Sequence, residues 1–171
     1  MGYTTANDVT FSNELFATDV IGLLDALEVK KTNVLGFSIG STVTQVLLLE
    51  YSQRLNKAII YATSTDGSDV VEALKEVVIN DSIVSRQIEA TTPWRTPLDK
   101  MSSVTNDVMF IVGTSDTTVG IESSKTLAST VPGAWLVQFK DATHVLMREA
   151  PDEFTKIVLA FLDINMTVEA Q

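Results

Sequence analysis

The chain has 171 residues, of which 45% are hydrophobic and 20% are charged, and its formal net charge is −10 at pH 7. A chain of this length can form one domain that buries roughly 70% of its unfolded surface, and its hydrophobic content excludes general disorder. The acidic balance argues against nucleic acids and anionic membranes as partners, because both are bound through clustered Lys and Arg.

Neither a leader nor a membrane span is predicted. The segment 1–16 lacks a basic region followed by an apolar stretch, and no apolar run reaches the roughly 18 residues of a membrane span. The absence of cysteine excludes disulfides and thiolate metal ligands, and it fits a reducing compartment. We therefore expect a cytoplasmic protein with a single domain over 1–171.

The first predicted elements are a helix, a strand and a second helix. From Ser12 to Glu28, apolar residues fall on one face of a helix; they are Phe16, Val20, Leu23, Leu24 and Leu27. The short apolar run 33–37 is typical of a strand buried on both faces in a parallel sheet. A second helix is predicted from about Ile39 to Tyr51.

Three more strands are predicted at 57–62, 107–113 and 134–139. A weaker helical segment, 121–131, separates the last two strands. Pro151 opens a final helix whose first turn carries acidic residues, and the tail after Asn165 is expected to fray. This alternation predicts an α/β fold with a mainly parallel sheet of about four strands and helices on both faces.

The stretch 64–106 separates two of these strands by far more than a usual crossover. It contains an amphipathic helix candidate and then a polar segment around Pro93; the candidate helix has Val70, Val71, Leu74, Val77 and Val78 on its apolar face. An inserted lid explains this length. An ordinary long crossover whose helix packs on the sheet is the alternative.

The run from Gly36 to Gly40 matches G-x-S-x-G and lies between a predicted strand and a predicted helix. A sharp turn at that junction forces Ser38 into strained backbone angles, so small residues are expected on both sides of it. Such a turn projects the serine hydroxyl above the sheet as a candidate nucleophile. A tight turn that needs glycines for packing alone is the alternative.

A serine nucleophile needs a general base and a carboxylate that orients the base. His144 is the single histidine of the chain, and it follows the fourth predicted strand. Asp116 follows the third strand, so its loop and that of His144 are expected on the same rim as Ser38. Asp141 is nearer to His144 in sequence, but a shared loop rarely allows the pairing. A local Asx-turn is the alternative role for Asp116.

The order Ser, Asp, His is the order of the α/β-hydrolases. The chain resembles the esterase, haloperoxidase-like and prolyl-aminopeptidase-like group of that family over about 10–62 and 107–162. The similar segments are 19–27 leading to 33–40, then 110–116, and the path from 131 through His144 to 154. The resemblance implies Ser38 as nucleophile, Asp116 as acid and His144 as base, with the backbone N–H of Ile39 as an oxyanion donor. It implies no cofactor and no metal.

The resemblance also has gaps. The family core begins with several strands that would precede Gly2, and the loop after one of them supplies a second oxyanion donor. The lid is short for the family, and Asp141-Ala142-Thr143 replaces its usual glycines before the histidine. Without a preceding strand, residues 32–37 lie at a sheet edge with unpaired N–H and C=O groups. We expect that edge to pair with another copy of the chain, giving a homodimer or larger assembly.

The sequence therefore predicts a serine hydrolase that cleaves a small, uncharged ester or related acyl compound through an acyl-enzyme. The alternative is a non-catalytic relative that acts as a binding or interaction module and keeps the turn for structural reasons. A nucleotide-binding doubly wound protein is a weaker third hypothesis, because neither G-x-G-x-x-G nor G-x-x-x-x-G-K-[ST] follows any strand.

Overall fold

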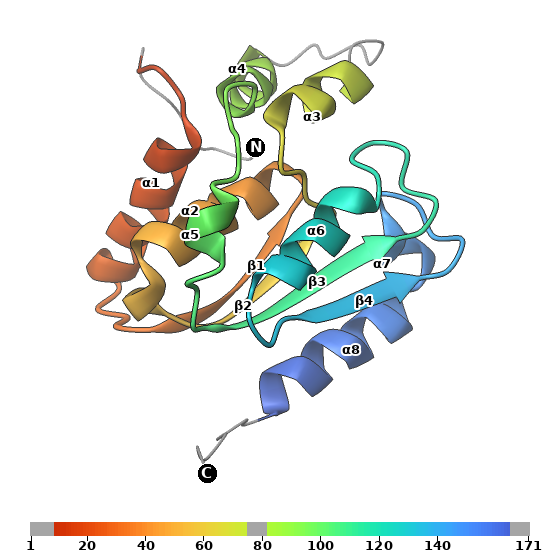
Figure 1. Ribbon diagram of the computed structural model, residues 1–171. Helices are drawn as coiled ribbons and strands as arrows, with labels where there is room; N and C mark the ends of the chain where they lie inside the picture. The colour runs from red at the N-terminus through yellow and green to blue at the C-terminus, as the bar shows by residue number, and fades with distance from the viewer. Residues whose placement is uncertain (1–8, 75–81, 165–171) are drawn as a thin grey trace.

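The computed structural model describes residues 9–74 and 82–164. Four parallel strands form one sheet in the order β1-β2-β3-β4 (Figure 1). The strands are β1 Thr32–Phe37, β2 Leu55–Tyr61, β3 Asp107–Gly113 and β4 Trp135–Phe139. Each strand pairs with its neighbour in sequence, and a helix lies in every crossover. The predicted α/β class with about four parallel strands is confirmed.

The helices of the described residues include four that the sequence predicted, of which α6 was the weaker prediction, and four others. Those predicted are α1 Asn13–Ala26, α2 Ile39–Glu50, α6 Glu122–Thr130 and α8 Pro151–Asp163. The others are α3 Gly67–Leu74, α4 Ser82–Thr91, α5 Leu98–Met101 and α7 Leu146–Glu149, with a 3₁₀ turn at Ser52–Arg54. Of these, the sequence predicts only α3. Helices α5 and α7 have four residues each, which is too short for a helical repeat of apolar residues to be seen. Val77, Val78 and the tail after Asn165 lie outside the described residues.

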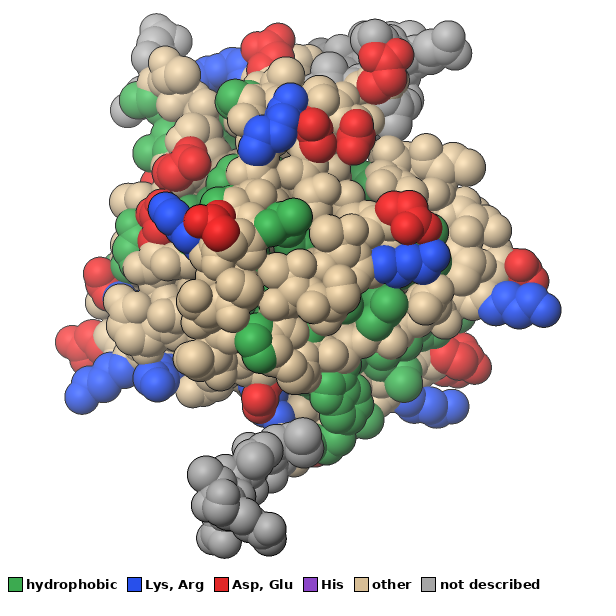
Figure 2. All heavy atoms as spheres, viewed as in Figure 1, with side chains coloured by type: hydrophobic (Ala, Val, Ile, Leu, Met, Phe, Trp, Pro, Cys, Tyr) green, Lys and Arg blue, Asp and Glu red, His purple; other side chains and the backbone are tan. Residues whose placement is uncertain are grey.

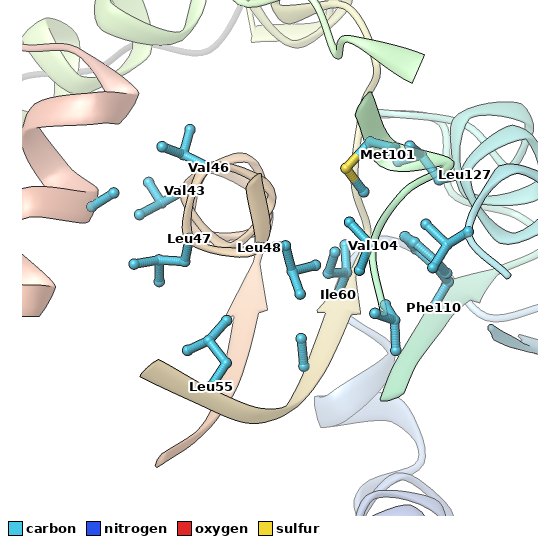
Figure 3. Close-up of a cluster of buried hydrophobic side chains, with 14 residues drawn as sticks. Val43, Val46, Leu47, Leu48, Leu55, Ile60, Met101, Val104, Phe110 and Leu127 are labelled. Atoms are coloured by element: carbon cyan, nitrogen blue, oxygen red, sulfur yellow. The ribbon is translucent and has the colours of Figure 1, made fainter. Parts of the chain in front are cut away.

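One face of the sheet packs against α2, with α1 and α6 beside it. Leu47 and Leu48 of α2 are buried in a cluster with Ile60 of β2 and Phe110 of β3 (Figure 3). Leu127 of α6 belongs to the same cluster. This layer packs α2, the helix that follows Ser38, against β1 and β2.

The opposite face packs against α7 and α8. Ile59 and Tyr61 of β2 alternate with Ile60, so their side chains point to this second face. They are buried there with Leu146 of α7 and Phe161 of α8. Helices therefore cover both faces of the sheet, as the alternation of elements predicted.

Strand β1 lies at the edge of the sheet and pairs only with β2 among the described residues. Gly36 is its one buried residue, and Leu35 is 42% exposed. The prediction that this run is buried on both faces is wrong, because Leu35 belongs to neither of the two buried clusters and is open to solvent. The expectation that residues 32–37 form a sheet edge is confirmed.

Helix α1 buries only part of the predicted stripe, since Phe16 and Val20 pack against the core cluster as expected. Its fully buried apolar residue is Ala17, which packs in the cluster around α2. Leu23 and Leu27 are 59% and 63% exposed, although the periodicity placed them on the core face. The helix packs against α2, and contact with a second helix covers a narrower stripe than contact with a sheet.

The stretch 64–106 has two parts. Helices α3 and α4 contact each other beyond the strand ends (Figure 1), whereas α5 returns to the sheet and buries Met101. Gln45 of α2 bonds both to the segment that leads into α3 and to the segment that follows α4. Its amide N–H donates to Thr63 Oγ1 at 2.8 Å and to the Ser64 carbonyl at 3.1 Å, and Thr96 Oγ1 donates to Gln45 Oε1 at 2.6 Å. The lid assignment and the single domain over 1–171 stay predictions.

In the described ranges, every helix is too short or too polar to cross a bilayer. On the face shown in Figure 2, basic side chains lie among acidic ones, and at most two basic side chains lie side by side. The cytoplasmic location and the exclusion of nucleic-acid and membrane partners stay predictions.

Candidate active site

Ser38 occupies a strained turn between β1 and α2. Its φ is 53° and its ψ is −118°, a backbone conformation that costs a non-glycine residue on the order of 1–3 kcal/mol. Main-chain bonds hold the turn: the N–H of Ser38 donates to the Tyr61 carbonyl at 3.1 Å, and that of Ser41 donates to the Ser38 carbonyl at 2.8 Å. The strain thus lies at the one residue whose hydroxyl the turn presents.

The two glycines of the turn are not equivalent. A Cβ atom on Gly36 would lie 2.2 Å from both the Gly40 carbonyl oxygen and Thr44 Oγ1. A Cβ atom on Gly40 would meet nothing within 4 Å. The expectation of a small residue on both sides is therefore met at Gly36 and wrong at Gly40, whose α-carbon faces open space next to the edge strand.

The structure brings Ser38, His144 and Asp116 together from the ends of three strands. The Nε2 atom of His144 lies 3.1 Å from Ser38 Oγ, and its Nδ1 atom lies 2.9 Å from Asp116 Oδ2. The His144 side chain is 17% exposed and that of Asp116 is 0% exposed. Residues 106 positions apart in sequence thus meet on the rim that the parallel strands predicted.

Asp116 makes both of the contacts that its position suggested, a local turn and an approach to His144. Its Oδ1 atom accepts the backbone N–H groups of Thr118 at 2.9 Å and Val119 at 3.1 Å, which is a local Asx-type turn. Its Oδ2 atom faces His144. The turn therefore orients the carboxylate that contacts the imidazole.

These contacts assign the tautomer of His144. A carboxylate only accepts hydrogen bonds, so the Nδ1 atom facing Asp116 carries a proton. The lone pair of a neutral imidazole is then on Nε2, which faces Ser38 Oγ. This arrangement can take a proton from the serine hydroxyl.

The acid loop and the histidine loop touch through their main chains. The Ser115 N–H donates to the Ala142 carbonyl at 2.9 Å. A Cβ atom on Gly113 would lie 2.2 Å from the same carbonyl oxygen, so the close approach requires glycine there. Asp141 is exposed with a φ of 60°, and Asp116 makes the contact with His144.

Two side chains that hold the histidine loop gave no signal in the sequence. Thr143 donates to Glu149 through its N–H at 2.8 Å and its hydroxyl at 2.6 Å, and these bonds lower the pKa of Glu149. Tyr61 donates its hydroxyl to the His144 carbonyl at 2.5 Å, and burial raises the pKa of Tyr61. In the sequence, Tyr61 reads as a core residue of a strand and Glu149 as a surface charge.

Ile39 opens α2, and its N–H belongs to the first helical turn, which has no intrahelical acceptor. A groove of about 460 Å³ lies beside it between α1 and β1. Its walls include Phe16, Val20, Leu35, Ile39, Val43 and Gln87. Across the described part of the chain, His, Asp and Glu side chains form no group of three or more that could hold a metal ion.

We compared the chain with known proteins by sequence and by structure. No protein-family model matches the chain. A curated relative, 2-hydroxymuconate semialdehyde hydrolase of Pseudomonas putida, is 19% identical, and the match covers 91% of this chain and 70% of the relative.

Solved structures are similar over most of the described fold. The enol-lactonase of Burkholderia xenovorans has a TM-score of 0.79 at 20% identity, with 95% of this chain and 77% of that chain covered. An alpha/beta hydrolase enzyme from a Medee basin deep-sea metagenome library has a TM-score of 0.82 at 15% identity, with 100% and 78% covered. The TM-scores show a shared fold, and at identities this low the likeness shows the fold alone.

Proposed function

We propose that this chain, which has the α/β-hydrolase fold, is a serine hydrolase that cleaves a small ester or related acyl compound through an acyl-enzyme. The observation that carries the proposal is the hydrogen-bonded series from Ser38 Oγ through His144 to Asp116, with distances of 3.1 Å and 2.9 Å. The similar proteins named above include a hydrolase and a lactonase, which supports the same class of reaction.

In the first half of the proposed reaction, His144 Nε2 removes the proton of Ser38 while Oγ attacks the acyl carbon. The imidazolium that forms is stabilised by Asp116, whose buried carboxylate already accepts the Nδ1 proton. His144 then gives its Nε2 proton to the leaving group. The acyl group remains on Ser38 Oγ.

In the second half, water attacks the acyl carbon while His144 takes its proton, and His144 then returns this proton to Ser38 Oγ as the bond to the acyl group breaks. Both halves pass through a tetrahedral oxyanion. The Ile39 N–H is the donor that we assign to it, because it begins the helix directly after Ser38. Removing one such donor typically lowers kcat by a factor of about 10²–10³, so the rate depends strongly on how many donors contact the oxyanion.

The proposed substrate is small and uncharged. A net charge of −10 disfavours the approach of anionic substrates. Helices α3 and α4, which stand beyond the strand ends, are proposed to act as a short lid over the site. A test panel therefore contains short-chain nitrophenyl esters and an uncharged lactone.

A fluorophosphonate probe with an intact-mass readout tests the proposal. An activated serine adds one phosphonyl group per chain, whereas an ordinary serine hydroxyl does not react at a comparable rate. We expect stoichiometric labelling of the wild-type protein, none of Ser38→Ala, and unchanged labelling of Ser129→Ala, whose serine is exposed on α6.

Ester hydrolysis gives the second readout. Nitrophenyl acetate hydrolysis is expected to fall to background in His144→Ala, because the base is lost. A folded wild-type protein that takes no label and hydrolyses none of the panel would contradict the proposal and favour a non-catalytic binding module.

A further inference from the structure

Tyr61 ends β2 directly beneath the candidate site. Its side chain is completely buried, and its hydroxyl donates to the backbone carbonyl of His144 at 2.5 Å. The two residues are 83 positions apart in sequence. This bond therefore ties the middle of the sheet to the loop that carries the imidazole.

Aromatic contacts surround the Tyr61 ring. It stacks on Phe37 with a centroid distance of 4.7 Å, and Phe37 in turn lies 5.0 Å from the His144 ring. Phe154 of α8 contacts Tyr61 from another side at 5.3 Å. Because Phe37 directly precedes Ser38, one packed aromatic group supports both the serine turn and the histidine.

The hydroxyl is the part of Tyr61 that packing does not explain. Burying a hydroxyl costs free energy unless it is hydrogen-bonded, and phenylalanine would fill almost the same volume without that cost. The group to which it donates is the carbonyl of His144 itself, and the backbone of Leu146 and Met147 in α7 also interacts with its oxygen. Burial also raises the pKa of Tyr61, so the phenol keeps its proton and remains a donor at neutral pH.

We propose that Tyr61 is a positioning residue whose hydroxyl holds the His144 main chain, so that the imidazole stays aligned between Ser38 and Asp116. The inference rests on the proposed function for its catalytic consequence. Other bonds hold the neighbouring residues of the histidine loop, among them those of Thr143 to Glu149 and of Asp141 to Thr114, and Tyr61 provides the one on the catalytic residue itself.

Nuclear magnetic resonance tests the positioning without any need for turnover. His144 is the only histidine, so its ring protons give unique signals. In the wild-type protein, the Nδ1 proton bonded to Asp116 is expected as a downfield resonance protected from exchange with water. Tyr61→Phe should accelerate this exchange by about tenfold, which is the factor that one net hydrogen bond represents.

Tyr51→Phe is the matched control. Tyr51 follows the last turn of α2 and packs with the cluster on the opposite face of the sheet. Its variant should leave the exchange rate of the His144 proton unchanged. An unchanged rate in folded Tyr61→Phe, or an equal acceleration in both variants, would overturn the proposal.

Kinetics supply the catalytic readout. For a nitrophenyl ester, Tyr61→Phe is expected to lower kcat by about tenfold with KM unchanged, because alignment of the base affects the chemical step and not substrate binding. A change confined to KM would overturn the positioning role. If the wild-type protein proves inactive, the proposed function fails, while the exchange measurement still decides the role of Tyr61.

A second substitution covers the case in which Tyr61→Phe does not fold. Replacing Tyr61 alone by 3-fluorotyrosine keeps the hydroxyl and makes it a stronger donor. The downfield His144 resonance should then shift while the fold is retained. An unshifted resonance in that protein would also overturn the proposal.

Discussion

The backbone N–H of Asp141 donates to Thr114 Oγ1 at 2.8 Å, so Asp141 joins the histidine loop to the acid loop through its main chain and not through its carboxylate. The carboxylate that reaches His144 belongs to Asp116. We therefore expect opposite effects on activity when each of the two aspartates is changed to asparagine.

Asp116→Asn should lower kcat for ester hydrolysis by about 10⁴, because an amide nitrogen facing Nδ1 favours the wrong imidazole tautomer. The fold should survive, since the asparagine carbonyl can still accept from Thr118 and Val119. Asp141→Asn should stay near wild-type activity, because asparagine tolerates the positive φ of that position. Comparable losses in both variants, measured with a nitrophenyl ester, would reject the assignment of the acid.

The glycines of the serine turn should differ in stability measurements. Gly36→Ala places a methyl group against the Gly40 carbonyl and Thr44, and it should lower the free energy of unfolding by about 3 kcal/mol. Gly40→Ala has open space and should leave stability unchanged or raise it by up to about 1 kcal/mol. Urea denaturation checks both, and equal destabilisation would show that the turn needs both glycines.

Glu149 should contribute to the acid sensitivity of the histidine loop. Hydrogen bonds from the hydroxyl and N–H of Thr143 lower its pKa in the folded protein below the ordinary 4.5. A carboxylate with a lowered folded pKa stabilises the protein above pH 4.5, and this contribution is lost as the pH falls through the folded pKa. Between neutral pH and 4.5, the difference in unfolding free energy between wild type and Glu149→Gln should stay constant.

Below pH 4.5 that difference should shrink. Asp66 also has a lowered pKa, through its bonds with Ser68, but it is present in both proteins and cancels in the comparison. A constant difference down to the acid transition would contradict the role given to the Glu149 carboxylate.

Lys57 should anchor the end of α8. Its ammonium group donates to the carbonyls of Phe161, at 2.9 Å, and Ile164, and it lies 3.8 Å from the Asp107 carboxylate. Lys57→Met keeps the length of the side chain but leaves these carbonyls without their donor, so we expect a loss of about 1–3 kcal/mol. Lys156→Met, on the exposed side of α8, is the control and should change thermal stability little.

The open edge of β1 should promote self-association. Its outward N–H and C=O groups have no strand partner in the described ranges, and a second copy offers the same edge for pairing. We expect a concentration-dependent dimer in light scattering. Leu35→Lys, which adds a charge at the exposed edge, should shift it to monomer, whereas Leu98→Lys on α5 should not. A wild-type protein that stays monomeric at high concentration would contradict this expectation.

The sequence by itself determined the alternation of strands and helices and the position of the serine turn. Both are local features of the sequence. Buried strands are short apolar runs, the apolar residues of long helices recur every three or four positions, and the serine turn has its own motif. The carboxyl ends of parallel strands share one rim, so the neighbourhood of Ser38 and His144 also followed from topology.

The tertiary structure decided which groups touch within that neighbourhood. It placed Asp116 and not Asp141 against the imidazole, left Gly40 beside open space, and put the Tyr61 hydroxyl on the His144 carbonyl. Each contact joins segments distant in sequence, and its geometry depends on how loops and layers pack. Local periodicity carries no information on such distances, because it records only which face of an element is apolar.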